Sequence, residues 1–268
     1  MRKRLDVLLV ERGLSESRAR ARAAIEAGCV RVDGRLAAKP GELTGETADI
    51  AAEPAHPWVS RSGLKLAHAL ELWPVNVAGR TVLDVGASTG GFTEVCLARG
   101  AAKVFAVDVG RGQLHPRLRD DPRVVNLEAT DARSLGPDLI PEAPQLIVCD
   151  ASFIGLAKVL PAALALAAWG ADLVGLVKPQ FEVGPGRVGK GGIVRDAAAQ
   201  AEALAAAEAF VCGQGWEVRA TADSPILGGD GNREFLLWAK KPGAILTAAR
   251  PGEGQDPGQV GTAGGDRA

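Results

Sequence analysis

The chain has 268 residues, 47% of them hydrophobic, and a formal net charge of −1. This length can supply a full core of about 180 residues together with a smaller second domain. The four cysteines (Cys29, Cys96, Cys149 and Cys212) form no C-x-x-C pair, and the three histidines form no cluster. We therefore expect reduced, mostly buried thiols and no metal site, which excludes a disulfide scaffold and a zinc protein.

A membrane protein has to be considered because residues 159–177 are largely apolar and approach the length of a membrane span. Pro161 and the sequence Gly170-Ala171-Asp172 divide this stretch into a helix and a strand, 173–177, and its alanines contribute little to membrane insertion. The first four residues, M-R-K-R, lead into an amphipathic segment and not into the apolar region of a signal peptide. We expect a soluble, cytoplasmic monomer that makes no contact with membranes.

Charge is unevenly distributed along the chain. Residues 1–40 hold ten Lys or Arg against five acids, a net charge of +5, whereas the remainder carries −6. This asymmetry is typical of a segment that contacts a polyanion. The alternative is a basic helix face that is merely solvated.

The same segment predicts two helices and a hairpin. An apolar helical period covers residues 5–12, and Ser15 or Ser17 can cap a second, arginine-rich helix that ends at Gly28. The D-G pair within residues 30–36 predicts a β-hairpin.

The order of these residues, R-L-D-x-L-L-V-x-x-G-L-x-x-S-R-x-x-A followed by G-C-V-R-V-D-G, resembles the small RNA-binding domain named after ribosomal protein S-four. The resemblance covers about residues 3–52. It implies docking on structured RNA by a small α+β domain, which we place at residues 1–55. The basic side chains of this domain that we expect to contact RNA are Arg4, Arg18, Arg20, Arg22, Arg31 and Lys39.

A second domain, placed at residues 56–241, follows a short proline-containing linker, and Ser60 can cap its first helix. β-branched apolar runs predict strands at 81–84, 103–108, 123–127, 145–149, 172–177, 216–222 and 233–239, with helices between most of them, including 196–212. Only a Gly-rich loop separates the last two strands, so they should form an antiparallel pair at the edge of the sheet. The predicted class is therefore α/β, with a Rossmann-like seven-stranded sheet whose last strand is antiparallel. Residues 242–268 are rich in Gly and Pro, which predicts a disordered tail.

The most informative segment is residues 81–94, T-V-L-D-V-G-A-S-T-G-G-F-T-E. A strand that ends in an acid is followed by a small-residue loop and a helix start, and the three glycines can take positive φ and let the backbone approach a ligand. The spacing is not G-x-G-x-x-G, so it predicts no pyrophosphate site. A second strand ends in Asp108, well placed for ribose hydroxyls. Two carboxylates without a basic phosphate clamp suit the cationic S-adenosylmethionine; a tight turn in any α/β domain is the alternative.

Ionisable residues also follow two later strands of the predicted sheet. Asp150 comes after L-I-V-C, and Lys178 after L-V, at the strand ends where open α/β sheets bind ligands. Glu234 opens the last strand and reaches the same edge if that strand is antiparallel, and Lys65 lies on the helix that leads into the first strand. Taken singly, Lys65 and Glu234 could equally be surface charges.

These four residues match the K-D-K-E tetrad of the ribose 2′-O-methyltransferases related to the heat-shock RNA methyltransferase FtsJ. Together with the N-terminal domain, the motifs W-V-S-R-S-G-L-K-L, D-V-G-A-S-T-G-G-F-T-E, V-K-P-Q-F-E and G-N-R-E-F resemble the TlyA family. These are bacterial proteins that often carry the label haemolysin and are regarded as ribosomal RNA cytidine 2′-O-methyltransferases. The resemblance covers about residues 3–240. One departure is the linker, where some relatives read R-A-W-V and this chain has His56-Pro57-Trp58-Val59, so a coupling role assigned to that arginine does not transfer.

The resemblance implies methyl transfer from S-adenosylmethionine to cytidine in the RNA of assembled ribosomal subunits. A ribose hydroxyl is a weak nucleophile, so a base must take its proton while in-line geometry is held. We assign Lys178 as this base and Lys65 as its cationic neighbour, which also positions the substrate. Asp150 is assigned as the orienting acid near the methyl donor, and Glu234 as the residue that holds a lysine.

The residues expected to hold the methyl donor are Asp84, Gly86, Ala87, Ser88, Thr89, Gly90, Gly91 and Phe92 at the methionine portion, Asp108 at the ribose, Val109, Asp131 and Ala132 at the adenine, and Asp150 and Phe153 nearby. Phe153 could instead be ordinary core. The basic loop 184–192 is suited to closing over RNA, with a disordered linker as the alternative, and it adds Arg187 and Lys190 to Arg61 as expected RNA contacts. Because aromatic residues are scarce, RNA shape and one extruded nucleotide should dominate recognition.

Three other functions compete with this hypothesis. A pore-forming haemolysin would need a membrane segment or a strongly amphipathic basic helix, and neither is present in the sequence. A non-catalytic RNA-binding protein would have no use for an intact tetrad and glycine loop. A small-molecule methyltransferase would leave the basic N-terminal segment unexplained.

Overall fold

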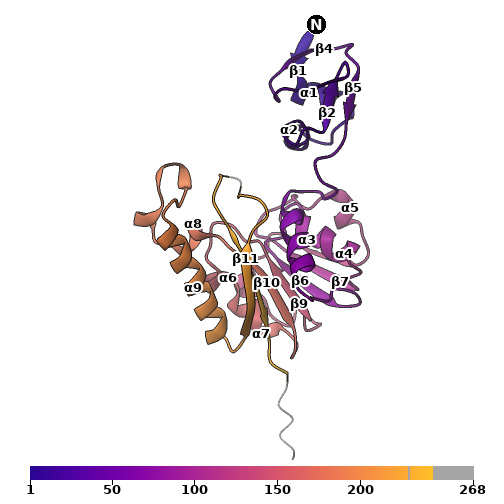
Figure 1. Cartoon of the computed structure of the whole chain (residues 1–268). Helices are drawn as coiled ribbons and strands as arrows, with labels where there is room; N and C mark the ends of the chain where they lie inside the picture. Colours follow the sequence, from indigo (N-terminus) through magenta and orange to yellow (C-terminus); the bar gives the residue numbers. More distant parts are fainter. Residues whose placement is uncertain (229, 244–268) are drawn as a thin grey trace, which may run out of the picture.

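A computed structural model of the chain describes residues 1–228 and 230–243, and these form two units joined by a short segment near residue 55 (Figure 1). Most of the tail that the sequence predicts to be disordered, residues 242–268, lies outside the described residues. Within the described ranges, none of the helices combines the length and apolar character needed to span a membrane.

The N-terminal unit packs two helices against small antiparallel sheets. Its elements are β1 (Arg2–Arg4), α1 (Leu5–Glu11), α2 (Arg18–Glu26), β2 (Val30–Val32), β3 (Arg35–Leu36), β4 (Leu43–Gly45) and β5 (Ile50–Ala52). β1 pairs with β4, and β2 lies between β3 and β5. Ser17 caps α2 by accepting a hydrogen bond from the backbone N–H of Arg20 at 3.3 Å, as predicted. Asp33 and Gly34 have φ of 49° and 78°, which confirms the predicted D-G hairpin turn.

The second unit is a seven-stranded α/β sheet with helices on both faces (Figure 1). Its elements are α3 (Ser62–Leu72), β6 (Thr81–Val85), α4 (Gly91–Ala98), β7 (Lys103–Val107), α5 (Pro116–Arg119), β8 (Val124–Leu127), β9 (Leu146–Cys149), α6 (Leu156–Val159), α7 (Pro161–Leu166), β10 (Asp172–Val177), α8 (Pro179–Glu182), α9 (Ala197–Gly213), β11 (Glu217–Asp223) and β12 (Phe235–Lys240). Three short 3-10 turns, Ala132–Ser134, Pro185–Arg187 and Lys190–Gly192, lie in the connections.

The strand order is β11-β12-β10-β9-β6-β7-β8. β12 is antiparallel to both β10 and β11, whereas β6 to β10 pair in parallel. The predicted α/β sheet with an antiparallel last strand is therefore confirmed. The predicted strand boundaries agree with the observed ones to within two residues, which is the usual uncertainty of a strand end.

Alternation along the central strands divides the core into two layers. Side chains on one face of the sheet pack with α6, α7 and α9; they include Leu83, Ile147 and Leu173. Side chains on the other face pack with α3 and α4; they include Val82 and Val148. Because both faces are covered, the parallel strands are mostly apolar, as expected for a buried parallel sheet, and Asp84 and Asp172 are buried exceptions.

Three local predictions were wrong. Ser60 does not cap α3, because the helix begins at Ser62 with Arg61 at its N-cap and no side-chain cap. Gly91 does not use a positive φ, since it is the first residue of α4. Only two of the four free thiols, those of Cys96 and Cys149, are buried, so the thiols are not mostly buried.

A buried carboxylate connects the amino ends of the central strands. Asp172, 2% exposed, accepts a hydrogen bond from Arg80 Nη1 at 2.6 Å and another from Trp238 Nε1 at 3.0 Å. Arg80 lies just before β6, and Trp238 lies on β12. Asp172 thus joins the antiparallel end of the sheet to the strand that leads into the glycine loop.

Replacing Asp172 with alanine should lower the free energy of unfolding by about 3–5 kcal/mol, because it leaves the Arg80 charge without its partner in a mostly buried position. Urea denaturation of the purified variant measures this change. The matched control is Asp223→Ala, which removes an exposed pair with Arg233 and should cost about 1 kcal/mol or less. Equal losses in the two variants would contradict the role given to Asp172.

Candidate functional site

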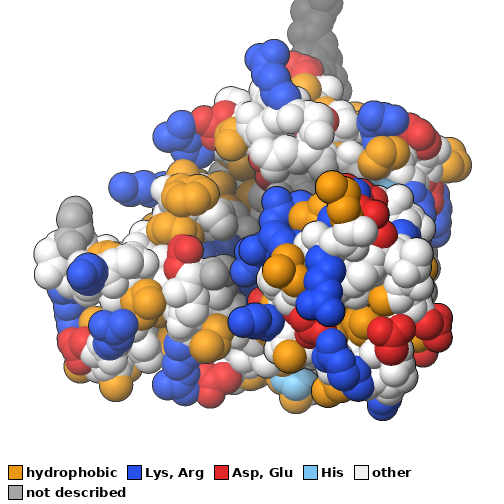
Figure 2. Space-filling model, turned by 90° about the horizontal axis from the view of Figure 1, so that it is seen from above, with side chains coloured by type: hydrophobic (Ala, Val, Ile, Leu, Met, Phe, Trp, Pro, Cys, Tyr) orange, Lys and Arg blue, Asp and Glu red, His pale blue; other side chains and the backbone are white. Residues whose placement is uncertain are grey.

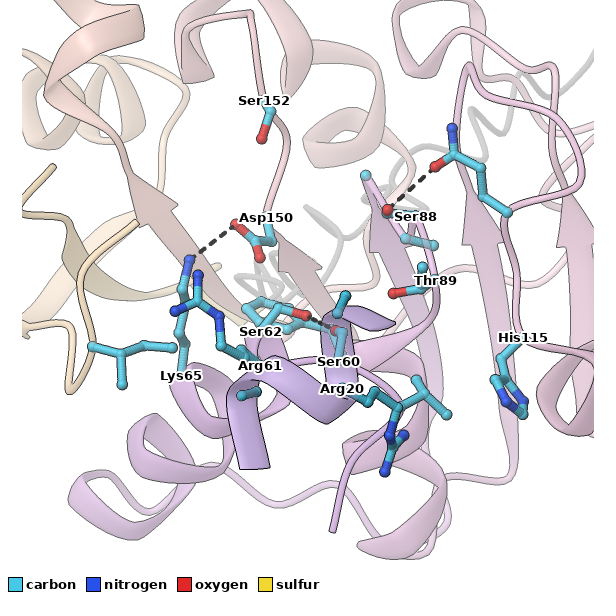
Figure 3. Close-up of a pocket in the computed structure, with 18 of the residues that line it drawn as sticks. Arg20, Ser60, Arg61, Ser62, Lys65, Ser88, Thr89, His115, Asp150 and Ser152 are labelled. Carbon is cyan, nitrogen blue, oxygen red and sulfur yellow. Dashed lines mark hydrogen bonds and ion pairs between the residues drawn. The ribbon is translucent and has the colours of Figure 1, made fainter. Parts of the chain in front are cut away.

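A cavity of about 990 Å³ opens at the carboxyl ends of the parallel strands. Its walls come from the glycine loop after β6, the segments after β9 and β10, the start of α3, and the face of α2 in the N-terminal unit. Figure 3 shows Ser88 and Thr89 on one side of this cavity and Lys65, Asp150 and Ser152 on another. Part of the predicted donor site, namely Gly86, Ala87, Ser88, Thr89, Phe92 and Phe153, therefore shares one cavity with the predicted tetrad, whereas Gly90, Gly91 and Asp108 are not part of the cavity wall.

The glycine loop has a conformation that few side chains would permit. Gly86 and Gly90 have φ of 84° and 96°, and a Cβ on Gly86 would lie 2.8 Å from the Cα of Ala151. A Cβ on Gly91 would collide with the hydroxyls of Ser60 and Ser62. Glycine is needed at 86 for both φ and close packing, and at 91 for close packing alone.

Asp108 at the end of β7 holds the far side of this loop. Its Oδ2 accepts a hydrogen bond from the backbone N–H of Ser88 at 2.8 Å, and its Oδ1 from Gly110 N–H at 2.7 Å. Gln113 in the following loop is held by Glu128, which accepts its backbone N–H. Hydrogen bonds from the backbone and from Asn126 hold the pKa of Glu128 at about 2. Each Asp108 oxygen keeps lone-pair capacity for a hydroxyl.

Asp84 is enclosed and does not line the cavity. Its Oδ2 accepts a hydrogen bond from Thr93 Oγ1 at 2.6 Å, whereas its Oδ1 is buried without a hydrogen-bond partner among the described residues. Burial raises the pKa of Asp84 to about 7, and the negative charges of Asp150 and Asp108 act in the same direction. Asp84 is therefore a buried acid under the glycine loop that titrates near neutral pH.

Two lysines and two carboxylates converge on the other side of the cavity. Lys65 Nζ donates a hydrogen bond to Glu234 Oε2 at 2.6 Å and lies 3.9 Å from Asp150 Oδ1. Lys178 Nζ lies 2.7 Å from the same Asp150 oxygen. All four side chains are at most 12% exposed. The structure thus brings the four predicted catalytic residues together as a nearly dry, charge-balanced cluster.

Lys178 also has a partner that the sequence did not indicate. Its Nζ donates hydrogen bonds to Ser152 Oγ at 2.8 Å and to the carbonyl oxygen of Asp150 at 3.1 Å. The approach to Asp150 Oδ1 is close but is not along a hydrogen-bond direction, so that contact is an ion pair. Ser152 stands two residues after the strand-end acid, and this spacing is the only sequence signal that could have found it.

Phe153 is 91% exposed, so it is not ordinary core. It has a φ of 66°, which is uncommon for a bulky residue. Its ring lies 5.4 Å from that of Phe181, and both residues line the cavity. Of the residues expected near the adenine, Val109, Asp131 and Ala132 are not part of the cavity wall, and Asp131 pairs with Arg133.

The predicted RNA-contacting residues fall into three groups. Arg20, Arg22 and Arg61 line the cavity together with Arg119, which the sequence did not single out. Lys and Arg side chains gather around the hollow of this face in Figure 2. The other residues of the N-terminal unit lie away from the cavity wall: Arg4, Arg18, Arg31 and Lys39. Arg187 and Lys190 lie on the loop before α9.

Arg20 differs from its neighbours on α2. Its side chain is 22% exposed, pairs with Glu16 at 3.3 Å, and donates a hydrogen bond to the carbonyl oxygen of Trp58 at 3.1 Å. On the far side of the linker, Glu94 accepts the backbone N–H of Val59. Arg20 therefore contacts the linker, whereas Arg22, 58% exposed, pairs with Glu26 of its own helix at 3.8 Å.

The basic loop 184–192 is fastened at both ends. Arg187 pairs with Glu202 on α9. Asn232, 1% exposed, accepts the backbone N–H of Val194 and donates to the carbonyl oxygen of Gly192, both at 2.9 Å. Because Asn232 is two residues before Glu234, the segment that holds the end of this loop also carries one residue of the tetrad.

Comparisons with known proteins agree with this geometry. The model of the FtsJ-like methyltransferase family matches residues 58–241, and that of the S4 domain matches residues 3–49. A relative from Mycobacterium tuberculosis (strain CDC 1551 / Oshkosh), named 16S/23S rRNA (cytidine-2′-O)-methyltransferase TlyA, is 49% identical over 89% of this chain and 90% of its own length. Hemolysin A of Brachyspira hyodysenteriae is 39% identical over 87% of this chain and 98% of its own length. A solved structure from Streptococcus thermophilus with a hemolysin label has a TM-score of 0.71 and 38% identity, and the match covers 92% of each chain.

The fold, the strand-end site and these matches define a methyltransferase joined to an S4 RNA-binding domain. The match to the relative from M. tuberculosis covers most of both chains at 49% identity, which identifies the particular family. The chain belongs to the TlyA family of the FtsJ-like methyltransferases.

The pKa of Asp84 predicts a pH dependence of stability. Between about pH 4 and 7 the folded protein keeps a proton that the unfolded chain has lost, so stability falls as pH rises through this window. Asp84→Asn removes this titration. The free energy of unfolding of the variant should therefore increase relative to that of the wild type as pH rises, by at most about 1.4 kcal/mol per pH unit. Chemical denaturation of both proteins at pH 5 and pH 8 measures the difference. A difference that is the same at both pH values would show that Asp84 is already ionised in the folded state.

Proposed function

We propose that this protein transfers a methyl group from S-adenosylmethionine to the 2′-hydroxyl of a cytidine in ribosomal RNA, acting in the cytoplasm on assembled ribosomal subunits. The observation that carries the proposal is the convergence of Lys65, Asp150, Lys178 and Glu234 beside a glycine loop at the carboxyl edge of the sheet. The relative from M. tuberculosis is named for this reaction. The basic S4 domain supports an RNA substrate.

The cavity fits the proposed donor. Ala87, Ser88, Thr89 and Phe92 line it beside Gly86, where the absence of a Cβ lets the loop come close to a ligand. Asp108 lies behind the loop and is not part of the cavity wall, and its carboxylate oxygens are of the kind that accept ribose hydroxyls. When bound, S-adenosylmethionine supplies an electrophilic methyl group.

The tetrad supplies positioning and proton transfer. Lys178 Nζ takes the proton of the 2′-hydroxyl in its neutral amine form, since an ammonium group has no lone pair to accept one; its nitrogen lies 2.7 Å from Asp150, the acid at the end of β9. Asp150 orients this amine. Glu234 holds Lys65, whose charge positions the ribose and its phosphates. The low exposure of all four side chains strengthens these electrostatic interactions, because a site without water screens charge poorly.

The N-terminal unit provides docking. Arg22, Arg61 and Arg119 line the cavity, where we expect them to contact the phosphates next to an extruded nucleotide. Arg4 and Arg18 are held in place by the buried carboxylate of Asp6, and lie where a larger RNA surface would extend. Phosphate contacts of this kind fix register and orientation and carry no sequence information themselves.

Methyl transfer from radiolabelled S-adenosylmethionine to purified 30S and 50S subunits tests the function, with the modified position mapped to the ribose 2′-oxygen. Lys178→Ala should reduce the rate by a factor on the order of a hundred or more, the usual contribution of a general base, while calorimetry shows nearly unchanged donor affinity. Lys178→Arg should not restore activity, because a guanidinium stays protonated. Lys103→Ala at the opposite end of the sheet is the matched control and should retain the wild-type rate. Substantial activity in Lys178→Arg would leave Lys178 as a positioning charge only.

Arg22 should contribute one phosphate contact to ribosome binding. Arg22→Ala should weaken affinity at low salt and reduce the slope of log affinity against log salt concentration by about one unit. Filter binding to ribosomal subunits over a range of salt concentrations measures this slope. Arg219→Ala removes an arginine of the edge strand β11 that does not line the cavity and should leave the slope unchanged. Identical slopes for Arg22→Ala and the wild type would remove Arg22 from the RNA contact surface.

A further inference from the structure

Ser152 belongs to neither the tetrad nor the expected donor site, yet its hydroxyl is a directed hydrogen-bond partner of the proposed base. Ser152 Oγ accepts from Lys178 Nζ at 2.8 Å. The side chain of Lys178 is 7% exposed, whereas Ser152 is exposed and lines the cavity. Figure 3 shows Ser152 beside Asp150 at the cavity wall. One hydroxyl therefore connects a buried amine to solvent.

The chemistry of the proposed reaction requires such a connection. When a sulfonium methyl group is transferred to a hydroxyl, the sulfur–carbon bond breaks, a carbon–oxygen bond forms and the O–H bond breaks, so each turnover releases one proton. A base that takes this proton in a nearly dry site has to pass it on before it can act again. Lys178 also lines the cavity, so while a substrate occupies that side of its nitrogen the proton has to leave through another group.

The other oxygen atoms around Lys178 are less suited to relay its proton, because Asp150 Oδ1, 2.7 Å from Nζ, receives no directed hydrogen bond from it. Among the described residues, its directed hydrogen bonds go to Ser152 Oγ and the carbonyl oxygen of Asp150. A carbonyl oxygen only accepts hydrogen bonds, whereas a hydroxyl has both a proton and two lone pairs. The hydroxyl can accept a proton from the ammonium group while it gives its own to a water molecule in the cavity.

We propose that Ser152 is the proton exit of the active site, which relays protons between Lys178 Nζ and the solvent of the cavity. The proposal rests on the proposed function in one respect, that Lys178 acts as the base of methyl transfer. The hydrogen-bond path itself is a property of the free protein. It can therefore be measured without donor or RNA.

The test uses two variants of the same shape. Ser152→Thr keeps the hydroxyl. Ser152→Val replaces the hydroxyl with a methyl group, which also prevents a water molecule from occupying that position. Both residues are β-branched and the position is exposed, so their effects on the backbone are matched. The difference between the two variants therefore measures the contribution of the hydroxyl group alone.

The first measurement is the hydrogen exchange rate of the Lys178 ammonium group, followed by NMR in full-length protein with 15N-labelled lysine. The chain has nine lysines, and the Lys178 signal is identified by its loss in Lys178→Arg. Exchange should be roughly tenfold or more slower in Ser152→Val than in Ser152→Thr, as expected when a proton-transfer group is removed. Equal exchange rates in the two variants would overturn the relay, whether or not the protein methylates ribosomes.

The second measurement is steady-state methyl transfer to an excess of ribosomal subunits, in which Lys178 has to release its proton between turnovers. Ser152→Val should be slower than Ser152→Thr at equal donor affinity, and added imidazole, a small diffusible base, should raise the rate of the valine variant only. A slow valine variant that imidazole does not rescue would overturn the relay and reduce Ser152 to a residue that positions Lys178. Absence of methylation by the wild type would instead refute the proposed function, and the exchange measurement would still decide the proton path.

Discussion

The antiparallel register between β10 and β12 is the constraint on which the site depends. It places Val177 opposite Phe235, so the residues just beyond this pair, Lys178 and Glu234, leave the sheet at the same edge. A slip by one residue would turn Glu234 to the other face of the sheet and leave the buried Lys65 without its carboxylate. Because an unpaired buried charge costs several kcal/mol, the tetrad and the register stabilise one another.

Buried carboxylates organise the cations of both units. In the N-terminal unit, Asp6 is fully buried and accepts hydrogen bonds from Arg4 and Arg18, which hold its pKa at about 2. In the methyltransferase unit, Glu234 accepts a hydrogen bond from Lys65, and Asp150 forms an ion pair with Lys178. The difference lies in exposure. The side chains of the two arginines are half-exposed, whereas those of the two lysines are enclosed, and we propose phosphate contacts for the former and action on a single group in the cavity for the latter.

The parts of the site that could be predicted are those that follow directly from strand ends. Asp108, Asp150 and Lys178 each come after an apolar run, and parallel strands end at one edge of a sheet, so their proximity follows from the pattern. The resemblance to a known tetrad added Lys65 and Glu234. The structure brings these residues together, and their chemical roles stay predictions. Contacts made by residues in irregular segments could not be predicted. The sequences around Ser152 and Asn232 have no helical or strand periodicity, so they do not indicate which residues these side chains contact.

Sequence alone determined the order of strands and helices, the antiparallel last strand, the glycine loop and the basic N-terminal unit, because each depends on local periodicity, turn chemistry or charge. Only the tertiary structure decided which of the arginines on α2 is enclosed and which stay exposed. Arg20 and Arg22 are indistinguishable in sequence, yet the first is enclosed against the carbonyl oxygen of Trp58 and the second is exposed. The structure likewise decided that Asp84 is fully enclosed while Asp108 is not, although both are strand-end acids. The physical reason is that burial depends on what packs over a residue from distant parts of the chain, and that packing sets both its charge state and the ligands it can reach.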